Sequence, residues 1–306
     1  MIEAVGLTKR FGKRTAVDDV SFTVRPGLVT GFLGPNGAGK STTMRLITGL
    51  DRASAGTVTV NGKPYAQHHA PLREVGVLLD AKAVHTGRSA RNHLLALAAT
   101  HGIGRKRVDE VIGMAGLESV ARQRVGNFSL GMGQRLGIAA ALLGDPATLI
   151  LDEPVNGLDP EGVIWVRNLV RHIASQGKTV FLSSHLMSEM ALTADHIIVL
   201  GRGRIIADAP VSDILAQAKG AGAVRVRTPD IARLTGLLGE PGVVVTNEEN
   251  VLEVSGITAA HIGELAAHAG IVLHELTPIA SSLEDAYLAL TQDDVEYRST
   301  DEGSAA

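Results

Sequence analysis

Two kinds of spacing between hydrophobic residues predict strands and helices along the first two thirds of the chain. Apolar runs and apolar–polar alternation, rich in Val, Ile, Phe and Thr, predict β-strands. These runs lie at residues 17–24, 28–34, 56–62, 147–151, 178–185 and 196–206. Spacings of three and four predict helices over residues 40–50 and across most of 88–143, with a loop around residues 101–107. Strands that alternate with helices imply a mostly parallel sheet with helices on both faces.

The pattern changes at residues 218–223, where a run of small residues predicts a linker. Beyond it, residues 224–276 follow the order strand, helix, strand, strand, helix, strand, which is the ferredoxin-like pattern. A last helix is expected over residues 281–291, with Ser282 as its N-cap and Asp285 three positions later.

These patterns define the domains that we expect. An α/β domain spans residues 1–218 and contains a helical subdomain at about residues 83–148. A small α+β domain follows at residues 224–290. Residues 293–306 are polar and rich in acidic side chains, which predicts a disordered tail.

Composition and charge narrow the classes of function. The 306 residues have a formal net charge of −3 and only 3% aromatic side chains, which argues against a nucleic-acid partner. The absence of cysteine excludes disulfides, thiolate chemistry and cysteine zinc sites, and it suits a reducing cytosol. Residues 1–11 do not resemble a signal peptide, and no apolar run is long enough for a membrane span. Any action at a membrane is therefore expected to depend on a partner protein.

The sequence GPNGAGKS at residues 34–41 carries the first candidate chemistry. It fits G-x-x-x-x-G-K-[ST] in full and lies between a predicted strand and a predicted helix. The glycines would let backbone N–H groups surround phosphates, Lys40 would reach the β- and γ-phosphates, and Ser41 would bind Mg²⁺. The motif in this context predicts a nucleoside triphosphate site rather than a glycine turn without a ligand.

Two carboxylates, Asp152 and Glu153, follow the apolar run at residues 147–151. Ligands of open α/β sheets bind at the carboxyl ends of the strands, where such side chains are released. Asp152 is therefore placed to hold Mg²⁺ through water, and Glu153 to take a proton from an attacking water as a general base. A solvated acidic turn is the alternative interpretation.

A second phosphate-binding design occurs at residues 127–135, NFSLGMGQR, where a serine and glycines precede an apolar helix. Together, these motifs resemble the nucleotide-binding subunit of ABC transporters, and the similarity covers roughly residues 2–218. The resemblance implies a P-loop ABC ATPase fold, with a mostly parallel sheet, an antiparallel β subdomain and a helical subdomain. It also implies the cofactors ATP and Mg²⁺.

The resemblance assigns expected roles to individual residues. Phe11 lies where the family has an aromatic residue that stacks on adenine. Asp152 and Glu153 correspond to the Walker B pair, and His185 to the switch histidine that contacts the γ-phosphate. The Walker A loop comprises Gly34, Pro35, Asn36, Gly37, Ala38, Gly39, Lys40, Ser41 and Thr42.

In this family two nucleotide-binding domains pack head to tail, so the resemblance implies a homodimer with two ATP molecules at its interface. Ser129 and Gly131 of the signature sequence would close over the γ-phosphate of the other subunit, and Asp159 lies in the D-loop. Met132 replaces a glutamine of the usual signature. Asp80 stands where the family has a glutamine that touches Mg²⁺, and an aspartate can accept from metal-bound water but cannot donate.

Residues 86–94, 129–139 and 281–291 resemble the exporter ATPase subunits of the bacitracin and daunorubicin resistance type. Those subunits energise a separate permease of the ABC-2 class. The resemblance implies export of a drug, antibiotic or bacteriocin-type molecule, from the cytoplasmic face of the cell membrane. Two alternatives remain open, namely a soluble ABC ATPase that remodels a target and a regulator that closes on ATP. We expect the small domain to steady the dimer or to regulate its closure.

Overall fold

The computed structural model describes residues 1–306 except 82, 217–222, 240–241, 249–250, 280–281 and 292–306. The described residues form two compact units that divide between Pro210 and Val211. The linker expected at residues 218–223 lies, apart from Ala223, outside the described residues, as does the tail expected at residues 293–306. Each unit has its own hydrophobic core.

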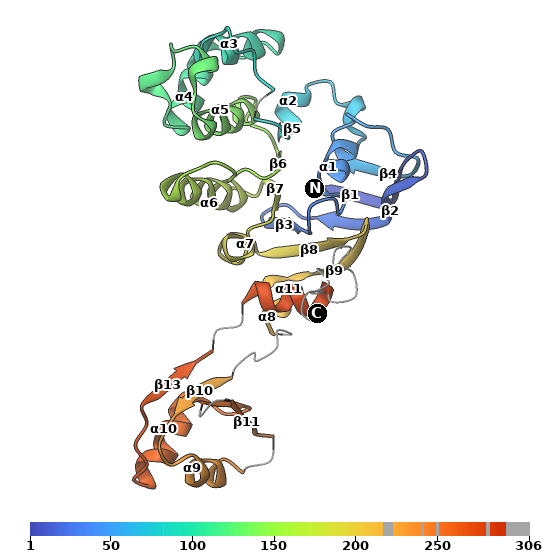
Figure 1. The fold of residues 1–306 in the computed structure, drawn as a ribbon. Helices are drawn as coiled ribbons and strands as arrows, with labels where there is room; N and C mark the ends of the chain where they lie inside the picture. The colour runs from blue at the N-terminus through green and yellow to red at the C-terminus, as the bar shows by residue number, and fades with distance from the viewer. Residues whose placement is uncertain (82, 217–222, 240–241, 249–250, 280–281, 292–306) are drawn as a thin grey trace, which may run out of the picture. The chain divides into compact units, whose positions relative to one another are not determined.

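A six-stranded sheet organises the first unit (Figure 1). Its spatial order is β5 (Val75–Leu78), β6 (Thr148–Leu151), β7 (Thr179–Ser184), β3 (Val29–Leu33), β8 (His196–Gly201) and β9 (Arg204–Pro210). The first five strands are parallel, whereas β9 returns antiparallel after a turn at Arg202 and Gly203, both of which have positive φ. Every residue of β3, β6 and β7 is buried, which explains their continuous apolar runs. The predicted mostly parallel sheet is confirmed.

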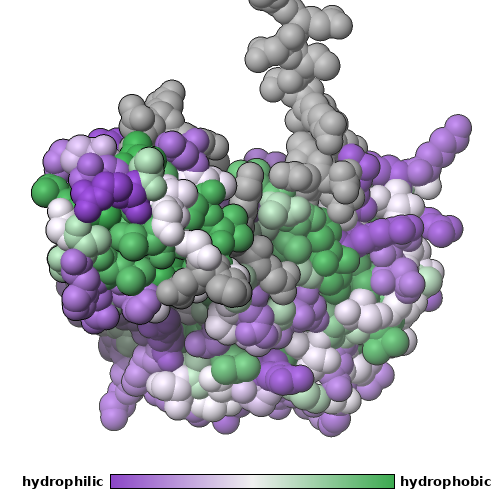
Figure 2. Space-filling view, turned by 90° about the horizontal axis from the view of Figure 1, so that it is seen from below, coloured by the Kyte–Doolittle hydropathy of each residue, from purple (hydrophilic) through white to green (hydrophobic). Residues whose placement is uncertain are grey.

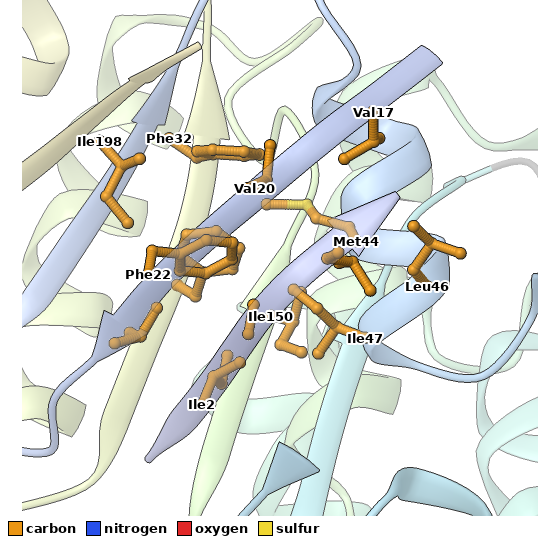
Figure 3. Close-up of a cluster of buried hydrophobic side chains, with 14 of the residues drawn as sticks. Ile2, Val17, Val20, Phe22, Phe32, Met44, Leu46, Ile47, Ile150 and Ile198 are labelled. Atoms are coloured by element: carbon orange, nitrogen blue, oxygen red, sulfur yellow. The ribbon is translucent and has the colours of Figure 1, made fainter. Parts of the chain in front are cut away.

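A three-stranded antiparallel sheet packs beside it in the order β2 (Arg14–Val24), β1 (Ile2–Phe11) and β4 (Ala55–Val60). The core between the two sheets centres on Phe22, Phe32 and Phe181, whose ring centroids lie 5.1–5.9 Å apart. Met44 and Ile47 of helix α1 (Lys40–Ile47) point into the same cluster (Figure 3). Helix α1 is therefore anchored by its apolar face, and its first turn remains at the carboxyl end of β3.

Among the described residues, three α-helices lie between β5 and β6 in the chain and gather at one end of the first unit (Figure 1). They are α3 (Ala90–Thr100), α4 (Arg105–Met114) and α5 (Leu130–Leu142). The expectation of a loop through residue 107 is wrong, because α4 already begins at Arg105. Its buried Val108, Val111 and Ile112 recur at helical spacing, so the basic residues before them form the exposed first turn.

The remaining elements of the first unit are short, except for α6. They are η1 (Tyr65–Gln67), α2 (Pro71–Glu74), η2 (Glu118–Val120), η3 (Val125–Asn127), α6 (Pro160–Ser175) and α7 (Met187–Thr193). No helix of the described residues is long and apolar enough to cross a membrane. On the face shown in Figure 2, hydrophobic residues gather in patches that are bordered by hydrophilic residues.

The second unit contains a four-stranded antiparallel sheet in the order β11-β12-β10-β13. This is the spatial order of a ferredoxin-like fold, and the prediction from residues 224–276 is confirmed. Ser282 caps the last helix, because its Oγ accepts from the Asp285 N–H at 3.0 Å. The elements are α8 (Val211–Ala216), β10 (Val224–Arg227), α9 (Ile231–Leu237), β11 (Val244–Glu248), β12 (Val251–Ser255), α10 (Ala259–His268), β13 (Glu275–Pro278) and α11 (Leu283–Thr291).

Candidate nucleotide-binding site

The glycine-rich loop lies between β3 and α1, as its sequence predicts. Gly37 and Gly39 have φ of +85° and +109°, a region that residues with a side chain rarely adopt. A Cβ at Gly39 would also overlap the carbonyl oxygen of Ala16, and one at Gly34 would overlap that of Leu200. Glycine is therefore required here both by backbone conformation and by the close approach of neighbouring strands.

Lys40 is the first residue of α1, and it is only 6% exposed. Its Nζ donates to the carbonyls of Gly34, at 2.6 Å, and Pro35, at 3.3 Å. Burial lowers the pKa of the Lys40 ammonium, and the nearby Glu153 and Asp152 carboxylates oppose that shift. The phosphate loop is thus folded around a buried cation that is available to an anionic ligand.

A cavity of about 460 Å³ opens over this loop. Phe11, at the end of β1, lies at its edge with 49% of the residue exposed, and the Lys9 ammonium is 4.8 Å from its ring centroid. An exposed aromatic ring beside a phosphate loop suits stacking on a nucleotide base. The cavity is lined by Phe11, Arg14, Ala16, Pro35, Asn36, Gly37, Gly39, Lys40, Ser41, Thr42 and Glu153.

The carboxylates after β6 meet the phosphate loop from the other side. Glu153 Oε1 lies 3.9 Å from Lys40 Nζ, and its Oε2 lies 2.8 Å from His185 Nδ1. The backbone N–H of His185 also donates to Oε2, at 3.3 Å. The structure therefore brings Lys40, Glu153 and His185 together from three segments of the sequence. This cluster brings a carboxylate, an imidazole and an ammonium together beside the glycine-rich loop.

The expected Mg²⁺ ligands come from three segments of the first unit. Ser41 follows Lys40 in α1 and lines the cavity. Asp152 directly follows β6, and Asp80 follows the neighbouring strand β5, since Leu78 pairs with Leu151. Mg²⁺ is usually held by one or two protein oxygens together with phosphates and water.

The signature and D-loop residues lie outside the lining of this cavity. Ser129 caps α5, its Oγ accepting from the Met132 N–H at 3.2 Å. Asp159 caps α6, its Oδ1 accepting from the Gly162 N–H at 2.9 Å. The two helix starts are neighbours, because a Cβ at Gly131 would lie 3.1 Å from the Gly157 carbonyl oxygen. The chain thus presents a second surface of polar helix N-termini, separate from the phosphate loop.

Sequence reasoning missed two polar residues at the base of the site. Ser183 is fully buried in β7, and its Oγ donates to Asp152 Oδ1 at 2.5 Å. Gln134 is 5% exposed in α5, and its Nε2 donates to the carbonyl of Glu153 at 3.1 Å. The signal for both was a polar side chain inside an otherwise apolar, buried element.

Comparison with protein families agrees with this geometry. The family model described as ABC transporter matches residues 17–156. An uncharacterized ABC transporter ATP-binding protein of Bacillus subtilis is 35% identical over 95% of this chain and 96% of the relative. The chain belongs to the ABC transporter ATP-binding proteins. It is accordingly an ATPase, with ATP as its nucleotide and Mg²⁺ as the metal.

Further relatives of this ABC ATPase have a stated transport role. The bacitracin transport ATP-binding protein of Bacillus licheniformis is 39% identical over 69% of this chain and 70% of its own length. The Nod factor export ATP-binding protein I of Rhizobium sp. (strain N33) is 34% identical over 96% of this chain and 98% of its own length. The predicted resemblance to the bacitracin-type group is therefore confirmed. Residues 222–284 match a domain of unknown function, DUF8746.

Solved structures confirm the fold of the first unit. The ATP-binding subunit of an ABC transporter superposes with a TM-score of 0.62 and 27% identity, over 71% of this chain and 92% of that protein. A dimeric bacterial ABC transporter cassette gives a TM-score of 0.63 and 25% identity, over 69% of this chain and 99% of that protein. The predicted P-loop ABC ATPase fold is thus confirmed.

Proposed function

We propose that this ATPase energises the export of a small molecule or peptide through a separate membrane permease. The convergence of Lys40, Glu153 and His185 over the phosphate loop is the observation that carries ATP turnover. Export is supported by relatives whose names state bacitracin transport, lantibiotic transport and Nod factor export. Two of the relatives extend over the second unit as well, since they match 95% and 96% of the chain.

The roles that we propose for the site follow from its contacts. Lys40 moves its ammonium hydrogen bonds from the loop carbonyls to the β- and γ-phosphates, and the Phe11 ring stacks on the base. Glu153 accepts the proton of the attacking water at its carboxylate, while His185 holds the other carboxylate oxygen through Nδ1. Ser41 and Asp152 would hold Mg²⁺, which neutralises phosphate charge when it is bound.

We further propose that two chains close on two ATP molecules. Ser129, Gly131 and Asp159 lie outside the cavity of their own chain, so their polar helix starts are available to the nucleotide of a second copy. The similar cassette of known structure is dimeric. ATP would favour the closed dimer because its γ-phosphate contacts the phosphate loop of one chain and the polar helix starts of the other. Hydrolysis would remove this contact and let the dimer open.

Capture from the native membrane tests the transport role. We expect the tagged full-length chain, extracted with mild detergent, to co-purify with a multi-span membrane protein in comparable amount. The chain would then lie on the inner face of the cell membrane through this permease. An unrelated tagged soluble protein from the same extract serves as control. Recovery of the chain alone, with ATPase activity intact, would instead favour a soluble regulator or remodelling factor.

Asp80 provides a test of the metal site. We propose that its carboxylate accepts from Mg²⁺-bound water, in the place of the family's glutamine. Asp80→Ala is expected to raise the Mg²⁺ concentration for half-maximal ATPase about 10-fold, a usual effect of losing an outer metal contact. Asp109→Ala, which removes an exposed carboxylate paired with Arg91, is the control and should leave that concentration unchanged. An unaltered Mg²⁺ dependence in Asp80→Ala would exclude this role.

A further inference from the structure

The backbone of Glu153 has a conformation that its residue type disfavours. Its φ is +49°, in the left-handed region, and it is one of the few non-glycine residues in that state among the described residues. Such a conformation persists only when surrounding contacts enforce it, and it is typical of functional sites. The direction in which the Glu153 carboxylate leaves the chain depends on this backbone. The contacts that enforce it therefore set the position of the carboxylate.

Buried side chains hold both ends of the Glu153 residue. On the N–H side, Ser183 Oγ accepts from the backbone N–H at 2.9 Å while it donates to Asp152 Oδ1. On the carbonyl side, Gln134 Nε2 donates at 3.1 Å, and the N–H of Asn156 adds a turn contact at 3.2 Å. Ser183 is 0% and Gln134 is 5% exposed, so water does not substitute readily for either contact.

We infer that Gln134 and Ser183 are positioning residues that aim the Glu153 carboxylate, an inference that rests on the proposed role of Glu153 as general base. The Ser183 hydroxyl group joins the Asp152 carboxylate to the backbone N–H of Glu153, so the side chain of one residue and the backbone of the next are held together. Gln134 ties the carbonyl of Glu153 to α5, the helix that begins directly after Ser129. Helix α5 is thereby linked to Glu153 of its own chain. In the proposed dimer the same helix also contacts the nucleotide of the second chain.

This link has a mechanical consequence for turnover. Gln134 lies in the second turn of α5, five residues after the Ser129 cap, so a rise of about 1.5 Å per residue leaves little helix between them. A displacement of the signature start that disturbs Ser129 would also pull on the Glu153 carbonyl through Gln134. When the signature residues of one chain bind the nucleotide held by the second chain, the position of Glu153 in the first chain would therefore change. That Glu153 acts on the other nucleotide of the dimer. The two active sites of a closed dimer would be coupled through this hydrogen bond.

Steady-state kinetics of the full-length chain test the inference. Gln134→Met keeps the side-chain length but removes the donor, and Ser183→Ala removes the hydroxyl group. Each is expected to lower the kcat of ATP hydrolysis about 10- to 100-fold, as small misplacements of catalytic groups do, with the Kd for ATP within threefold of wild type. Gln176→Met is the control for the same substitution, at the residue that follows α6. It removes an exposed amide 2.9 Å from His172 Nε2 and is expected to keep kcat within threefold.

Combining Gln134→Met with Glu153→Gln distinguishes a positioning role from a general loss of stability. In Glu153→Gln, single-turnover hydrolysis should be equally slow with and without Gln134→Met, because the group being aimed is already lost. Further slowing in that background, or a weakened Kd, would show a structural role instead. If Gln134→Met has the wild-type kcat while the separate variant Glu153→Gln is inactive, the positioning role is overturned and the proposed base stands. Wild-type hydrolysis by Glu153→Gln would overturn the proposed base itself.

Discussion

Replacing Glu153 by Gln is expected to lower the kcat of ATP hydrolysis by about 10²- to 10⁴-fold, the usual contribution of a general base. The amide has nearly the same shape as the carboxylate, so ATP should still bind. It cannot accept the proton of the attacking water at neutral pH. His185 Nδ1 would still find an oxygen acceptor in the amide, which keeps the imidazole in place. The variant should therefore bind ATP and remain closed on it.

Two measurements check this expectation together. Phosphate release gives kcat, and size-exclusion chromatography with MgATP shows whether the variant accumulates as a dimer. Glu110→Gln is the matched control, since Glu110 is an exposed carboxylate paired with Arg107 on α4. It should hydrolyse ATP at the wild-type rate and accumulate no dimer. A Glu153→Gln protein that turns over like wild type would remove Glu153 from the chemistry, whatever its oligomeric state.

The main elements of the site could be predicted because local sequence dictates them. The glycines of residues 34–39 are required by positive φ and by close backbone approach, and both requirements leave a fixed spacing in the chain. Asp152 and Glu153 were recognisable because a fully buried strand of four residues ends directly before them. The order of strands and helices over residues 224–276 was likewise enough to predict the sheet of the second unit.

The contacts beneath the site could not be predicted, because they join segments far apart in sequence. Gln134 and Ser183 approach Glu153 from 19 and 30 positions away, and neither spacing has a periodic signature. The left-handed φ of Glu153 is equally invisible, since glutamate gives no sign of it. The start of α4 was missed because its basic residues were interpreted as a loop. The decisive signal was the buried apolar face that follows them.

The other large effect is expected at Lys40. Lys40→Met should weaken ATP binding about 100-fold, since charge-assisted hydrogen bonds to phosphate contribute about 1.5–3 kcal/mol each and about 1.4 kcal/mol corresponds to a factor of ten. The nucleotide-free protein should change little in stability. Burial lowers the pKa of Lys40, which means that burying the ammonium is costly, and Met removes that cost. The opposing loss is the donor to the carbonyls of Gly34 and Pro35.

Thermal unfolding with and without MgATP distinguishes these two contributions. A ligand that binds only the folded state raises Tm in proportion to the logarithm of its concentration over Kd. Wild type should therefore show a clear rise with saturating MgATP, and Lys40→Met almost none, from a similar starting Tm. Lys178→Met is the control, because it removes a lysine that pairs with Asp145 outside the cavity. It should lose some stability and keep the full rise. An unchanged rise in Lys40→Met would mean that the ammonium stays on the loop carbonyls when ATP binds, and its role would then be to hold the loop in shape.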